Sequence, residues 1–153
     1  MKHEIDGCPT FAWVFLIGIG AVDLTRGFMH TVLLQYSATN IAGLDLSHSA
    51  GDQLQLLGVF GVSNWLTGLL FIVIGLKARH LVPYALSFIL LSYFVAGRIV
   101  KAVAHTTAPF GGRVFMLVYL IACAVVLAAT LALRVRDRVG QARRTPTGSR
   151  VSP

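Results

Sequence analysis

Four long apolar stretches constrain the fold of this chain more than any other feature of its sequence. They cover residues 11–35, 54–76, 82–105 and 114–133. A helix of ~20 residues crosses a hydrocarbon layer of ~30 Å, so each stretch is long enough to span a bilayer. Hydrophobic residues make up 56% of the 153 residues and charged residues only 12%, which is about half the charged share of a soluble domain. The chain is therefore predicted to be an integral membrane protein.

The polar segments between the apolar stretches are short, which predicts how the helices connect. Four spans with short connections favour an all-α membrane protein, with four transmembrane helices in an up-down-up-down bundle. The longest connection, residues 36–52, is rich in loop-forming Gly, Ser, Asn and Asp. Asp52 is the predicted N-cap of the second span. We predict a transmembrane domain over 1–133 and a basic, largely disordered cytoplasmic tail over 134–153, whose first residues extend the fourth helix.

The distribution of basic residues predicts the orientation in the membrane. The formal net charge is +7, and most of the basic residues flank the spans on one side. These are Lys2, Lys77, Arg79, Arg134, Arg136, Arg138, Arg143, Arg144 and Arg150. The opposite side has Arg113, and residues 36–52 contain no Lys or Arg. The positive-inside rule then predicts a multi-pass cell-membrane protein with both termini cytoplasmic. This placement suits lipid headgroups, so we expect membrane lipids and no nucleic acid as partners.

Small residues form a stripe along the second span. Gly61, Asn64, Gly68 and Gly75 project within ~60° of one another at ~100° per residue. Membrane helices associate through such stripes because small side chains let backbones approach. We interpret the stripe as a packing seam in which Asn64 can hydrogen-bond across helices.

Two polar triplets interrupt the first and third spans with the same spacing. Each places three ionisable residues at i, i+3 and i+7, on one face of a helix. The triplets are Asp23, Arg26 and His30, and Arg98, Lys101 and His105. Spans one and three of an alternating bundle run in the same direction, so both triplets are expected in the outer half. An ionised residue in a span is costly without a partner. The candidate partners of Asp23 are Arg26 on its own helix and Arg98 at the matching position of span three. We predict the ion pair between Asp23 and Arg98, which joins spans one and three.

The first outer loop adds further ionisable residues near these triplets. Its apolar residues suggest that it packs over the bundle and delivers Asp45 and His48 to the basic side chains below. The result is an expected polar pocket that opens outward. Its predicted ligand-binding residues are Asp23, Arg26, His30, Asp45, His48, Arg98, Lys101 and His105.

The function that we predict from these features is that of a non-catalytic membrane component or accessory subunit. In this interpretation the ion pairs fix the register of the helices without chemistry. Expected partners are a homodimer or a larger membrane complex. The alternative is a small-solute or proton-coupled carrier, because Asp23 and His30 are able to relay protons and the positive balance favours a small anionic ligand.

Two further interpretations remain open, although no catalytic residue, cofactor or metal is assigned from the sequence. His30 and His105 lie at matched depth, as axial ligands of a haem would, and His48 with Asp45 or Asp52 resembles a zinc-like set. A lipid-headgroup enzyme would use His as a base and Arg or Lys to bind phosphate. No nucleophile–His–acid set, Gly-rich phosphate loop or CxxC motif accompanies these residues.

Overall fold

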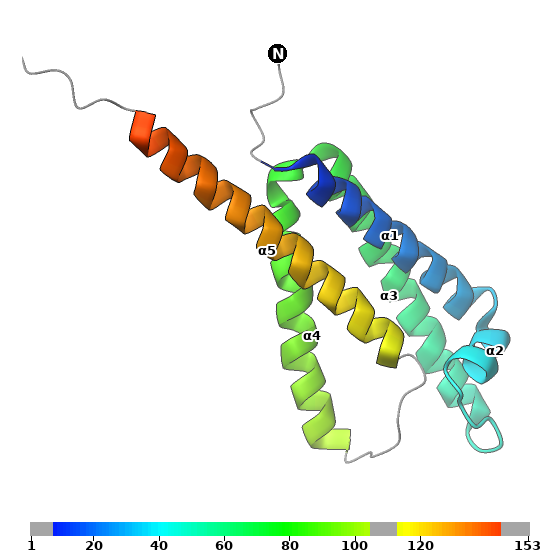
Figure 1. Ribbon diagram of the computed structural model, residues 1–153. Helices are drawn as coiled ribbons and strands as arrows, with labels where there is room; N and C mark the ends of the chain where they lie inside the picture. The colour runs from blue at the N-terminus through cyan, green and yellow to red at the C-terminus, as the bar shows by residue number, and fades with distance from the viewer. Residues whose placement is uncertain (1–7, 105–112, 145–153) are drawn as a thin grey trace, which may run out of the picture.

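The computed structural model describes residues 8–104 and 113–144, which fold into four long helices (Figure 1). These are α1 (Thr10–Thr31), α3 (Ala50–Lys77), α4 (Val82–Ala104) and α5 (Arg113–Arg144). Each is long and apolar enough to cross a membrane, and no strand occurs in the described residues. The predicted all-α four-helix bundle is confirmed.

The connections contain short helical turns that the sequence did not predict. α2 (Leu34–Tyr36) and the π-helix η1 (Ser37–Ile41) follow α1, and the 3₁₀ turn η2 (Arg79–Leu81) precedes α4. α1 therefore ends at Thr31 rather than at residue 35. We call the end where α1 and α4 begin the inner end and the opposite end the outer end.

The start of α3 differs from the prediction. The helix begins at Ala50, and Ser49 takes the N-cap position in the left-handed conformation, at φ 51°. Asp52 lies in the first turn of α3, so its prediction as the N-cap is wrong. A carboxylate in the first turn still interacts favourably with the helix dipole.

α1 and α3 pack closely through glycine. Gly61, Asn64, Gly68 and Gly75 are the buried residues of α3, which confirms the predicted seam. A Cβ added at Gly20 would lie 2.7 Å from the carbonyl oxygen of Gly68. Since no side chain separates the helices there, the two backbones touch along the seam.

The other helices meet α1 in a second, more limited core. Buried apolar residues of α1, α4 and α5 pack together, namely Ala12, Leu16, Ile19, Val82, Leu86, Ile89, Tyr119 and Cys123. The members from α4 all belong to its first half, and every residue from 93 to 103 is exposed. Figure 1 shows the consequence: α4 diverges from the α1–α3 pair toward the outer end.

Candidate functional site

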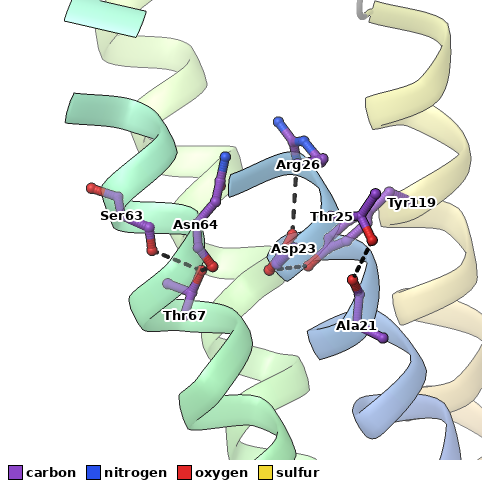
Figure 2. A network of polar contacts seen from close by, with 8 residues as sticks. All are labelled: Ala21, Asp23, Thr25, Arg26, Ser63, Asn64, Thr67 and Tyr119. Carbon is purple, nitrogen blue, oxygen red and sulfur yellow. Dashed lines mark hydrogen bonds and ion pairs between the residues drawn. The ribbon is translucent and has the colours of Figure 1, made fainter. Parts of the chain in front are cut away.

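A buried carboxyl group lies where α1, α3 and α5 meet. Asp23 is only 5% exposed. The guanidinium Nη1 of Arg26 lies 3.8 Å from its Oδ1, and the hydroxyl of Tyr119 on α5 donates to its Oδ2 at 3.5 Å. Thr67 and Asn64 of α3 lie on the other side of the carboxyl group (Figure 2). The polar network therefore links three helices through one acidic residue.

The predicted ion pair between Asp23 and Arg98 is not formed, and this prediction was wrong. Within the described residues, the ion-pair partner of Asp23 is Arg26, three residues along the same helix. Arg98 is exposed, because α4 has left the core before it reaches that position. The carboxyl group instead joins α1 to α5 through Tyr119.

Arg26 and His30 pack beside an aromatic ring on α3. The guanidinium carbon of Arg26 lies 5.5 Å from the centroid of the Phe60 ring, and the His30 ring lies 5.8 Å from it. Nδ1 of His30 hydrogen-bonds with Oγ of Ser37 at 2.6 Å. Both partners are buried. His30 thus fastens the end of α1 to the π-helix that follows it.

Asp45 and His48 shape the outer loop locally. Both are exposed. Oδ1 of Asp45 accepts the backbone N–H of Ser47 at 2.9 Å, and the side-chain amide of Gln53 donates to the carbonyl oxygens of Asp45 and His48. The Ser47 N–H holds the pKa of Asp45 below its usual value. Among the contacts of the described residues, none joins the side chain of Asp45 or His48 to Arg26, Arg98 or Lys101.

Lys101 and His105 are the remaining predicted site residues. Lys101 is exposed on the outer half of α4. His105 lies outside the described residues, so the suggested haem ligand pair of His30 and His105 is only half placed. No group of three His, Cys, Asp or Glu residues able to hold a metal occurs in the part of the chain that the structure describes. His48, Asp45 and Asp52 therefore do not form a zinc-like set.

Several residues of the network were not among the predicted site residues. Tyr119, Phe60, Thr67 and Ser37 all contact or flank the triplet of α1. A tyrosine deep in an apolar span is the one sequence signal that pointed to this place, since a buried hydroxyl needs a partner. Phe60 could not be predicted as a site residue, because nothing in the sequence separates it from the other aromatic residues of the apolar helices.

Four helices that are long and apolar enough to cross a bilayer define the class, a multi-pass helical membrane protein. Comparison with protein-family models, with curated proteins and with solved structures found no match.

Proposed function

We propose that the chain is a non-catalytic accessory subunit of a membrane assembly, which docks a partner on the outer half of α4. The observation that carries this proposal is the exposure of every residue from 93 to 103, including Arg98 and Lys101. Neither base forms an ion pair with another described residue. The ionisable residues of α1, in contrast, are buried or nearly so and contact one another and their neighbours.

A charged side chain within a span is costly unless it is paired, hydrated or able to reach the headgroups. Insertion scales put the cost at about 2.5–3.5 kcal/mol at the centre of a helix. Arg98 lies one helical turn deeper than Lys101, so a carboxylate on a partner helix at its depth would stabilise it. Small residues are close by at Ser92, Ala96 and Gly97, and a Cβ added at Gly97 would meet nothing within 4 Å. This surface suits close approach of another helix.

The partner that this chemistry favours is a different membrane protein with an Asp or Glu in one of its spans. A second copy of this chain is less suitable as the partner. Among the described residues, the acid within its spans is Asp23, which is buried and already contacts Arg26 and Tyr119. The exposed acids Asp45 and Asp52 belong to the outer loop and the first turn of α3.

The test is photo-crosslinking in native membranes from a benzoylphenylalanine at position 94. The matched control position is 66 on α3, since Phe94 is 68% exposed and Leu66 70%. We expect an adduct with a second membrane protein from position 94, none from position 66, and loss of the adduct in Arg98→Glu. Reversing the charge of the partner's intramembrane acid should restore it.

Other adducts would contradict the proposal in distinct ways. An adduct of twice the chain's own mass would show self-association and overturn the assignment of the partner. Crosslinks to lipid alone would show that lipid and not a partner covers this face of α4, and the docking role would be wrong.

A further inference from the structure

Two buried hydrogen-bond donors at the centre of the bundle have no acceptor within hydrogen-bond distance. They are Nη1 of Arg26 and Nδ2 of Asn64. Asn64 is only 6% exposed and the Arg26 side chain 16%. Within a span, a donor finds no bulk water to replace the missing partner, so an unsatisfied one is strongly unfavourable. The network therefore lacks an acceptor at this place.

The packing of α1 on α3 brings the two donors to neighbouring levels. Gly20 packs against Gly68, and Gly27 packs against Gly61. Asn64 lies between Gly61 and Gly68 on α3, so it faces the turn of α1 that carries Asp23 and Arg26. In Figure 2 the Arg26 guanidinium and the Asn64 amide nitrogen extend toward the same side of the network.

The carboxyl group that pairs with Arg26 makes only long contacts. The Asp23 carboxyl group serves Arg26 at 3.8 Å and Tyr119 at 3.5 Å, both longer than a good hydrogen bond. The hydroxyl of Thr67 lies beside the Asp23 carboxyl group and within hydrogen-bond distance of two backbone carbonyl oxygens of its own helix. The N–H groups on Nη1 of Arg26 and Nδ2 of Asn64 therefore have no acceptor within hydrogen-bond distance.

The electrostatics favour a neutral acceptor over an anion. Asp23 and Arg26 balance each other's charge, and a second carboxylate or a phosphate would lie beside Asp23 and be repelled. The site is within the apolar length of the helices and beside the rings of Phe60 and Tyr119. A lipid-soluble molecule suits such surroundings.

We infer that a lipid-soluble molecule binds here through a carbonyl oxygen, which accepts hydrogen bonds from Arg26 and Asn64. A quinone and a lipid ester share this chemistry. The inference goes beyond the proposed docking role and does not depend on it, since the site lies in α1, α3 and α5 rather than on the outer half of α4.

The first arm of the test uses duroquinone as the probe and Trp65 as the reporter. Trp65 packs on α1 at Gly27, and in a Trp13→Phe background it is the one tryptophan left. We expect saturable quenching of its fluorescence in the purified full chain. Asn64→Leu should weaken the affinity at least tenfold, while the adjacent exposed Ser63→Ala should not change it.

The second arm distinguishes a lipid ester from a quinone. The chain is placed in nanodiscs of dioleoyl phosphatidylcholine or of its diether analogue, which lacks carbonyls, and the lipid retained on release is counted by native mass spectrometry. Retention of the ester lipid alone, lost in Asn64→Leu, would assign the carbonyl to lipid. Asn64→Ser serves if the leucine variant does not fold. If neither probe binds in an Asn64-dependent way, buried water satisfies the donors and the inference is overturned.

Discussion

Asp23 shows how one acidic residue is accommodated inside a membrane bundle. It is almost fully buried, yet its partners are a base from the same helix and a tyrosine hydroxyl from α5. An ion pair within one helix neutralises the charge but does not hold two helices together. The contact with Tyr119 does, and it connects the α1–α3 pair to α5. Removing one member of a buried pair leaves an uncompensated charge, which is worse than removing both.

A double-mutant cycle on Asp23 and Arg26 tests this account. We expect Asp23→Asn and Arg26→Gln each to lower the free energy of unfolding, and the double variant to lose less than the sum of the two. The coupling should be about 0.5–3 kcal/mol, as for residues in contact. The measurement is unfolding of the detergent-solubilised chain by sodium dodecyl sulfate, followed by tryptophan fluorescence. Strict additivity of the two losses would contradict a functional ion pair in the fold.

At the scale of the elements, the seam between α1 and α3 is the tightest contact in the described chain. It depends on glycine because backbone lies directly opposite backbone. A Cβ at Gly20 would meet the Gly68 carbonyl oxygen at 2.7 Å and Cγ1 of Ile72 at 2.8 Å. The isoleucine side chain has some freedom to turn away, but the carbonyl oxygen moves only if the helix moves.

Two glycines on α1 provide a matched pair of substitutions. Gly20→Ala should destabilise the protein by about 1–3 kcal/mol, the usual cost of overpacking. Gly18→Ala should be neutral or stabilising by up to about 1 kcal/mol, because a Cβ there meets nothing within 4 Å and alanine is the better helix former. Thermal unfolding in one detergent compares them. Equal losses for both variants would show that α1 and α3 do not approach as closely as described.

At the scale of the whole molecule, the bundle is closed toward its inner end and divergent toward its outer end. α1 and α3 form a close pair, while α4 and α5 join them through the core around Leu16, Leu86 and Cys123. Beyond that core α4 diverges from the α1–α3 pair (Figure 1). The exposed bases of α4 lie on this divergent part, which is why we assign docking to it.

The orientation of the whole molecule is tested by reporter fusions. We expect alkaline phosphatase to be active when fused after Ser49, in the outer loop, and inactive after His80 or Arg144. The physical reason is the excess of Lys and Arg at the inner end. Fusions of green fluorescent protein at the same three positions should give the opposite pattern. Phosphatase activity after Arg144 would reverse the proposed orientation.

The sequence by itself determined the spans and one of their packing faces. The length of an apolar run is set by the thickness of the bilayer, and the stripe from Gly61 to Gly75 follows from the period of a helix. Both are local properties of the chain, so they could be predicted without knowing what lies opposite. The residue at which α1 ends could not be predicted in this way, because the buried hydrogen bond between His30 and Ser37 at that end is a tertiary contact.

Only the tertiary structure decided which side chains meet. Asp23 had two candidate bases, Arg26 three residues along its own helix and Arg98 on another span, and the local sequence does not decide which of them it meets. The choice follows from where α4 leaves the bundle, which separates the two triplets and leaves Asp45 and His48 in their own loop. In a membrane, apolar surface gains little from meeting another helix rather than lipid. The hydrophobic pattern therefore specifies that each helix crosses the membrane, but not which residues of the other helices its polar side chains will contact.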